Sequence, residues 1–188
     1  MKNFKEYHYL IHYIGNIIGV GFVIFILLAA FSEQLLLGEL ACPLCLLQRM
    51  AYVAVGVAFS MNLTLGIRSS HYGMAILASL AGILIATRQT LLHILPNDPG
   101  FGSTIMNIHV YTWNIVIFFI IVALTAVALH FGYAFNTKES KVGKIMKKIA
   151  VTFIMIFGFL ILANLISVFL ECGLSTCPDD PIEYKLFN

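Results

Sequence analysis

Charged residues are scarce in this sequence. Only 11% of its 188 residues are Asp, Glu, Lys or Arg, whereas 60% are hydrophobic, and the mean hydropathy is +0.93. Soluble domains carry roughly a quarter charged residues and less than half apolar ones. The composition therefore excludes an ordinary soluble protein and indicates an integral membrane protein.

Long polar segments are also missing. A hydrocarbon core of about 30 Å is crossed by roughly 20 helical residues. Stretches of that length with few charges lie near 13–36, 46–67, 73–95, 109–134 and 149–170. The segments between them are short and leave no room for a soluble catalytic domain. We predict one all-α, polytopic membrane domain over 1–188, and we interpret the first stretch as too long for a cleaved signal peptide.

The basic residues are confined to a few segments. Eight of the eleven precede the first span, lie between the second and third spans, or lie between the fourth and fifth: Lys2, Lys5, Arg68, Lys138, Lys141, Lys144, Lys147 and Lys148. Five spans place these three segments on one side, which the positive-inside rule makes cytoplasmic. The amino terminus is therefore predicted inside and the carboxyl terminus outside.

No cysteine falls in a predicted cytoplasmic loop or in the middle of a span. Cys42 and Cys45 lie in the first outer loop, and Cys172 and Cys177 follow the fifth span on the same outer side. Two close pairs on an oxidising face indicate disulfides or a redox relay. A four-cysteine zinc site is the alternative, although no histidine or carboxylate that could support it is evident near the first pair.

The stretch ACPLCLLQRM opens the second span. Pro43 suits the first position of a helix, so Cys42 is predicted as its N-cap and Cys45 as its third residue. The positive helix end should then favour the Cys45 thiolate. Arg49 lies one turn further on the same face. Its charge is costly at that depth unless it pairs with the thiolate, a lipid phosphate or a carbonyl oxygen of a redox cofactor; snorkelling to the headgroups is the alternative.

Three segments together resemble the DsbB family of quinone-linked thiol oxidases of the bacterial inner membrane: ACPLCLLQRMA, ATRQTLLHILPNDPG and HVYTWNIV. The resemblance covers about residues 10–135, and CxxCxxxR is its most specific motif. It implies a four-helix bundle that holds ubiquinone or menaquinone near the outer leaflet. In this chain an additional fifth transmembrane helix and a periplasmic redox tail follow over 149–188.

The resemblance also implies roles for single residues. Cys45 would be in electronic contact with the quinone, and Cys42 would exchange with the second cysteine pair. Arg49 would be the cation on the quinone side. Polar quinone contacts are expected at the outer end of the third span, where this chain has Arg88, Gln89 and His93.

The second cysteine pair departs from the family pattern. In the family it usually lies between the third and fourth spans, but PNDPGFGSTIMNIH has no cysteine, and the pair lies instead in ECGLSTCPDDP. We infer that Cys172 and Cys177 take the partner-facing role. The alternative is a structural disulfide that pins the tail. A bond that closes so small a loop would stabilise little, and such bonds are often reducible.

The function that the resemblance implies is enzymatic. The chain would be a quinone-dependent protein-disulfide oxidoreductase that takes electrons from a reduced periplasmic thioredoxin-fold oxidase (DsbA-like). It would lie in the inner membrane with all its cysteines periplasmic, contacting lipid and no nucleic acid. One alternative is a vitamin K epoxide reductase-like protein, although in that family CxxC usually follows the partner-facing cysteines. The other is a non-catalytic transporter or assembly factor, which the few charges within the spans disfavour.

Overall fold

Five helices and one short hairpin form the described part of the chain. The computed structural model describes residues 2–36, 38, 40–95, 100, 102–131, 142–174, 177 and 184, with side chains from residue 6 on. The elements are α1 (Lys2–Leu36), α2 (Pro43–Thr64), α3 (Ser69–Leu92), β1 (Thr104–Ile105), β2 (Ile108–His109), α4 (Val110–His130) and α5 (Lys144–Cys172). All five helices are long and apolar enough to cross a membrane. The predicted all-α, polytopic fold is therefore confirmed.

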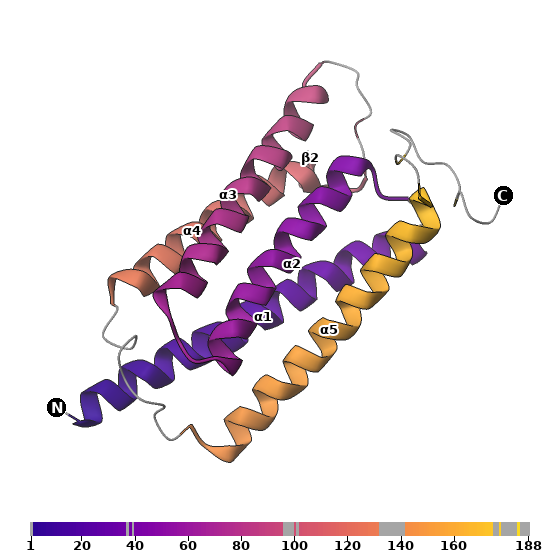
Figure 1. Cartoon of the computed structure of the whole chain (residues 1–188). Helices are drawn as coiled ribbons and strands as arrows, with labels where there is room; N and C mark the ends of the chain where they lie inside the picture. Colours follow the sequence, from indigo (N-terminus) through magenta and orange to yellow (C-terminus); the bar gives the residue numbers. More distant parts are fainter. Residues whose placement is uncertain are drawn as a thin grey trace.

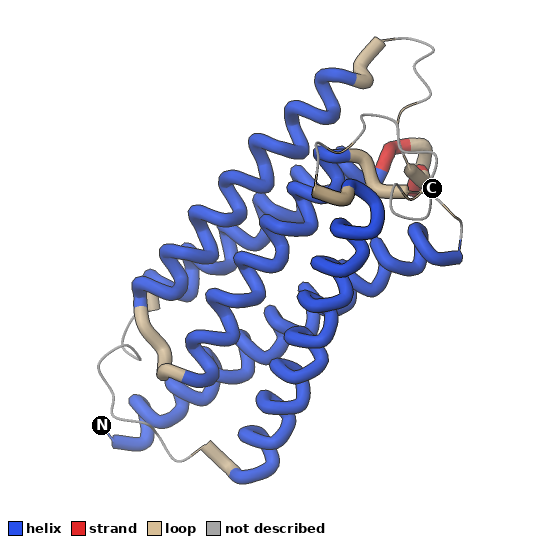
Figure 2. The backbone as a smooth tube through the Cα atoms, turned by 45° about the vertical axis from the view of Figure 1, so that its right-hand side comes forward, coloured by secondary structure: helices blue, strands red, loops and turns tan. Residues whose placement is uncertain are grey.

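Successive helices run in opposite directions (Figure 1). Helices α1 to α4 pack in chain order, each against the next, and α5 packs against α1 and α2. One end of the bundle carries the N-terminus and the α2–α3 connection, and the other carries the hairpin and the end of α5 (Figure 2). We call the second end the cysteine end, because α2 begins there with Cys42 as its N-cap and α5 ends there at Cys172.

The helices extend beyond several of the predicted spans. Helix α1 begins at Lys2 and α5 at Lys144, whereas the apolar stretches were placed from residues 13 and 149. The reason is that hydropathy marks only the part of a helix that suits hydrocarbon. Backbone hydrogen bonding continues into the more polar turns on either side. The start of α2 matches the prediction, with Cys42 as N-cap and Pro43 at the first helical position.

The β1–β2 hairpin was not predicted. Thr104 pairs with His109 and Ile105 with Ile108, and the two turn residues between them have positive φ angles of 55° and 61°. Positive φ at both central residues characterises the type I′ turn that matches strand twist. The hairpin connection is joined to α1, because the hydroxyl of Ser103 donates a hydrogen bond to the Glu33 carboxylate.

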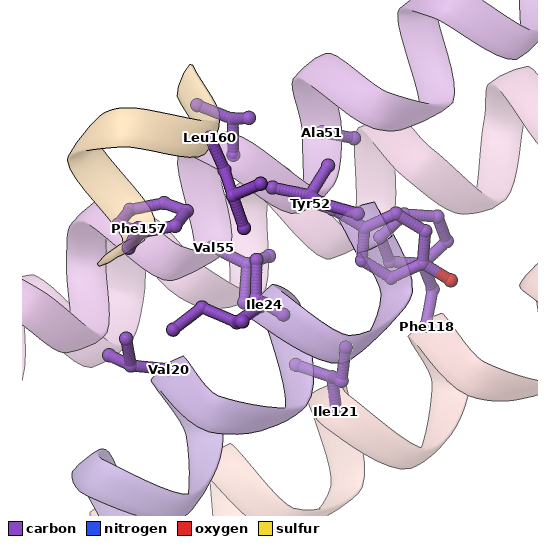
Figure 3. Packing of buried hydrophobic residues seen from close by; sticks show 12 residues of the cluster. Val20, Ile24, Ala51, Tyr52, Val55, Phe118, Ile121, Phe157 and Leu160 are labelled. Carbon is purple, nitrogen blue, oxygen red and sulfur yellow. The ribbon is translucent and has the colours of Figure 1, made fainter. Parts of the chain in front are cut away.

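A buried apolar cluster joins four helices around the middle of the bundle (Figure 3). Tyr52 and Phe118 are its largest fully buried side chains, and their rings stack with centroids 4.2 Å apart. Helices α1, α2, α4 and α5 supply the labelled members, which are Val20, Ile24, Ala51, Tyr52, Val55, Phe118, Ile121, Phe157 and Leu160. Because α5 contributes Phe157 and Leu160, the fifth helix is part of this core rather than an appendage.

Glycines allow aromatic rings to approach the helix backbones. A Cβ atom at Gly82 would collide with the Phe118 ring, and one at Gly56 would collide with Phe157. Small residues permit this close packing between membrane helices, where lipid supplies no hydrophobic drive for association. Phe118 is held by the stacked Tyr52 ring and has little freedom to move away.

Polar side chains and a cavity mark the end of the bundle that carries the N-terminus. Asn16 donates to the Tyr72 hydroxyl at 2.8 Å, and Asn62 donates to Asn16 at 2.9 Å, which links α1, α2 and α3. A cavity of about 700 Å³ lies between α1 and α4, with His12 and Phe131 among its lining residues. None of the predicted redox residues lines this cavity.

Replacing Gly82 with alanine should destabilise the packing of α3 on α4. The new methyl group would overpack the Phe118 ring, and such overpacking typically costs about 1 to 3 kcal/mol. Thermal unfolding in detergent, followed by circular dichroism, measures the loss. Gly73→Ala in the same helix is the matched control, because a Cβ there meets nothing within 4 Å. Equal unfolding temperatures for the two variants would contradict this account of the packing.

Candidate redox site

Both cysteine pairs lie at the cysteine end as disulfides. The bonds join Cys42 to Cys45 and Cys172 to Cys177. Cys172 is buried in a cluster with Ala41 and Leu46, and both Cys45 and Cys177 pack against that cluster. The two pairs are 127 residues apart in the chain, counting from Cys45 to Cys172 (172 − 45). The fold therefore places the end of α5 against the start of α2.

The disulfide state bears on the zinc alternative. Zinc binds cysteine as the thiolate, and all four cysteines are in disulfides here. Among the described residues, no group of three or more His, Cys, Asp or Glu side chains is arranged to hold a metal ion. The geometry is that of two adjacent disulfides.

The start of α2 acts directly on Cys42. The Cys42 backbone is extended, with φ −62° and ψ 157°, and its Sγ accepts the backbone N–H of Cys45 at 3.1 Å. This is the usual bond of an N-cap side chain to the third helical residue. From the sequence we expected the positive helix end to favour the Cys45 thiolate. The structure adds a direct backbone hydrogen bond to the Cys42 sulfur.

Gln89 of α3 contacts both sulfurs of this pair. Its Nε2 group donates to Cys42 Sγ and to Cys45 Sγ, each at 3.3 Å. The side chain is fully buried, so its amide group has to find partners inside the protein. A thiolate accepts hydrogen bonds more strongly than a neutral disulfide sulfur. Gln89 is therefore placed to stabilise the reduced state of Cys42 and Cys45.

A chain of side-chain hydrogen bonds extends from Gln89 across the bundle. Gln48 of α2 donates to Gln89 Oε1 at 2.6 Å, and Asn114 of α4 donates to Gln48 Oε1 at 2.6 Å. The Tyr52 hydroxyl donates to Asn114 Oδ1 at 2.8 Å. Every donor in the chain points toward the disulfide, so each bond polarises the next. The chain fixes the orientation of the Gln89 amide relative to the sulfurs.

Arg49 points toward α1. It is buried, and its Nη1 and Nη2 groups donate to Gln34 Oε1 at 2.7 Å and to the Ala30 carbonyl at 3.1 Å. The guanidinium carbon lies 5.7 Å from the centre of the Phe31 ring, which favours a cation in that position. Arg49 therefore does not snorkel to the surface. Its partners are protein groups on α1, and these were not among the partners predicted from the sequence.

The three residues predicted at the end of α3 are in different surroundings. Gln89 meets the disulfide, whereas the Arg88 side chain is exposed. His93 is the C-cap of α3, and its ring lies 5.9 Å from that of Tyr111. Tyr111 stacks in turn on His109 with centroids 5.0 Å apart. The structure thus joins Gln89 to the sulfurs and places His93 in an aromatic group beside the hairpin.

Four polar residues of the site were missed from the sequence: Gln34, Gln48, Asn114 and Glu171. Each is a polar residue within or at the end of an apolar stretch, where an unpaired polar group is costly. That cost was the available signal. It indicates that partners exist, but it does not say which helix supplies them.

Comparison with known proteins bears on the first part of this site. Residues 14–102 match the family model described as "Disulfide bond formation protein DsbB". The match covers just under half of the chain and supports a DsbB-family assignment for these residues, which we call the DsbB-family region. The DsbB-family region contains the Cys42–Cys45 disulfide, Arg49 and Gln89, and it ends before α4 begins at Val110.

Two curated relatives carry the name "Disulfide bond formation protein B". The protein of Nitrosomonas eutropha is 40% identical over 72 residues, which cover 36% of this chain and 44% of that protein. The protein of Nitrosomonas europaea is 44% identical over 71 residues, which cover 36% of this chain and 43% of that protein. The matches thus span less than half of either relative. No solved structure gives a significant match.

Replacing Gln89 with leucine should shift the Cys42–Cys45 pair toward its disulfide form. The variant loses N–H bonds that are stronger to a thiolate, and a hydrogen bond to a charged group contributes about 1.5 to 3 kcal/mol. The dithiol–disulfide equilibrium constant should therefore change by about tenfold or more. It is measured against glutathione by thiol alkylation and mass spectrometry, in a Cys172→Ser/Cys177→Ser background.

Thr90→Val is the matched control for this variant. Thr90 follows Gln89 in the chain, but its hydroxyl bonds the Ala86 carbonyl and contacts Thr112 rather than a sulfur. An equilibrium constant that changes equally in both variants would show that the effect comes from general disturbance of α3.

Proposed function

We propose that the chain is a membrane thiol oxidase that supports disulfide bond formation. It reoxidises a periplasmic thioredoxin-fold disulfide oxidase (DsbA-like) and passes the electrons to membrane quinone. The observation that carries the proposal is the packing of a second disulfide, Cys172–Cys177, against the helix start that holds Cys42 and Cys45. Adjacent disulfides can exchange through mixed disulfides. The family assignment of residues 14–102 supports the same chemistry.

The tail pair receives the electrons from the partner. Cys172 is buried, whereas Cys177 is partly exposed, so an incoming thiolate reaches the Cys177 sulfur more easily. Its attack forms a partner–Cys177 disulfide, breaks the Cys172–Cys177 bond and releases Cys172 as a thiolate. The second partner thiol then attacks the partner sulfur of that mixed disulfide. The partner leaves as a disulfide, and Cys177 is released as a thiolate.

The second exchange passes the electrons inward. The Cys172 thiolate attacks Cys42 Sγ, and Cys45 leaves as a thiolate next to the N–H group of Gln89. Cys177 then attacks Cys172, which restores the tail disulfide and releases Cys42. The N–H groups of Cys45 and Gln89 stabilise the Cys42 thiolate. The two electrons that the partner loses are then held by Cys42 and Cys45, and the two protons that its thiols lose enter the surrounding water.

The surroundings of the first pair fit a quinone, either ubiquinone or menaquinone. A bound quinone would supply an acceptor for two electrons and two protons. A guanidinium has five N–H groups, and Arg49 uses two of them for Gln34 and Ala30, so others can bind a carbonyl oxygen. Arg49, Gln89 and Cys45 would hold the ring, with His93 and Arg88 toward the end of α3. The buried positive charge favours negative charge on a bound carbonyl group.

The charge distribution supports a location in the bacterial inner membrane. Arg68 directly precedes α3, and α5 begins with Lys144, Lys147 and Lys148 in its first turns. The start of α3 and the start of α5 lie at the end of the bundle opposite the cysteine end (Figure 1). Basic residues remain on the cytoplasmic side during insertion. The cysteine end would therefore face the periplasm, where disulfides persist and a DsbA-like partner is found.

Replacing both tail cysteines should separate the two activities. The Cys172→Ser/Cys177→Ser variant should lose oxidation of the reduced thioredoxin-fold partner. It should still reduce a short-chain quinone with dithiothreitol, because a small dithiol can reach Cys42 and Cys45 directly. Partner oxidation is measured by thiol alkylation, and quinone reduction by loss of its ultraviolet absorbance.

The Cys42→Ser/Cys45→Ser variant is the counterpart, and it should lose both activities. Partner oxidation at the parental rate by the tail variant would mean that Cys172–Cys177 is a structural disulfide. If the parental protein does not reduce quinone, both quinone-coupled functions are excluded, including the vitamin K epoxide reductase-like one. The remaining alternative is then a non-catalytic membrane protein.

The inward exchange can be trapped with single cysteines from each pair. In the Cys45→Ser/Cys177→Ser variant, Cys42 and Cys172 should form a disulfide under mild oxidation, since both lie where α2 begins and α5 ends. Non-reducing peptide mapping detects the bond. The matched Cys42→Ser/Cys177→Ser variant leaves Cys45 and should form its bond with Cys172 more slowly. The reverse order of rates would exchange the roles of Cys42 and Cys45, and no bond in either variant would contradict the relay.

A further inference from the structure

Among the described residues, the most deeply buried acid at the cysteine end has no part in the proposed electron relay. Glu171 lies in the last turn of α5, next to Cys172, and its exposed fraction is 1%. Its Oε2 accepts a hydrogen bond from Gln34 Nε2 at 3.3 Å, and the backbone of Ala41 also interacts with the carboxyl group. A carboxylate this deeply buried needs a compensating positive charge.

Arg49 supplies that charge through a shared amide. The side chain of Gln34 accepts from Arg49 at its Oε1 and donates to Glu171 at its Nε2. One glutamine thus bridges a cation on α2 and an acid on α5. The charges of Arg49 and Glu171 attract each other across this bridge. The Gln34 amide also donates to Ser167 Oγ at 2.8 Å, which fixes it against α5.

We propose that Glu171 is the counter-charge of Arg49 and a positioning residue for it, so that α5 completes the redox site begun by α2 and α3. The inference deepens the proposed function and rests on it. Helix α5 lies outside the DsbB-family region. This chain therefore uses its additional helix both to carry the tail cysteines and to set the electrostatic environment of the first pair.

The sign of the effect follows from the charges of the two redox states. Reduction of the Cys42–Cys45 disulfide creates thiolate character one helical turn from Arg49. A cation stabilises the thiolate, and a nearby carboxylate opposes that stabilisation. Removing the Glu171 charge leaves Arg49 uncompensated and favours the dithiol. Removing the Arg49 charge leaves Glu171 uncompensated and favours the disulfide.

A double-mutant cycle in the Cys172→Ser/Cys177→Ser background tests the proposal without quinone or partner. Glu171→Gln should shift the dithiol–disulfide equilibrium of Cys42 and Cys45 toward the dithiol by about tenfold, and Arg49→Gln should shift it about as far toward the disulfide. The variant with both changes should lie within about threefold of the parent, because removing a buried pair together leaves no unpaired charge. In thermal unfolding, each single variant should be less stable than the double variant, because each single variant leaves one buried charge unpaired.

Glu33→Gln is the matched control. Glu33 of α1 is also near Arg49, but its carboxylate is held by the Ser103 hydroxyl rather than by Gln34. We therefore expect Glu33→Gln to shift the dithiol–disulfide equilibrium by less than about twofold. An unchanged equilibrium in Glu171→Gln, or a double variant that unfolds at a lower temperature than both single variants, would overturn the proposal. If Glu171→Gln does not fold, restored folding in the double variant supports the pairing, and a double variant that also fails to fold contradicts it.

These measurements are separate from the test of the proposed function. The equilibrium of Cys42 and Cys45 is read against glutathione, whereas the relay is read by partner oxidation with the tail cysteines intact. If the protein fails to oxidise its partner but the Glu171 and Arg49 variants show the expected shifts, the pairing of Arg49 with Glu171 is supported and the relay is contradicted.

Discussion

Polar side chains buried between membrane-spanning helices have to find their hydrogen-bond partners within the protein, and this requirement organises the cysteine end. Water cannot satisfy an amide or guanidinium group at that depth, and each unsatisfied group costs free energy. The Gln89 amide resolves this by donating to the two sulfurs and accepting from Gln48. The contact of Gln89 with the disulfide therefore depends on the side chains behind it in the hydrogen-bond chain, which are Gln48, Asn114 and Tyr52.

The same requirement gives the fifth helix its place. Arg49 is a buried cation on α2, and its partners Gln34 and Ala30 belong to α1. Gln34 passes the contact on to Ser167 and Glu171 of α5. A helix that lies outside the family-matched region is thus held by polar contacts at the cysteine end and by apolar packing in the middle of the bundle.

This arrangement offers one account of how a second cysteine pair can lie in a new part of the chain. Thiol–disulfide exchange needs sulfurs that can meet, and it does not need a particular connection between them. The end of α5 lies against the start of α2, so Cys172 lies near the first pair although it is far away in sequence. The short hairpin occupies the connection in which the family usually carries this pair.

Local features of the sequence determined the helices, their alternating direction and the start of α2. Hydrophobic length predicts a span because the bilayer thickness is fixed, and Pro43 after Cys42 predicts the cap because proline lacks the N–H that the first helical position does not need. Only the tertiary structure decided which polar side chains meet. The pairing of Gln89 with the sulfurs and of Arg49 with Gln34 depends on how each helix is rotated about its axis, and that rotation is set by packing against neighbouring helices.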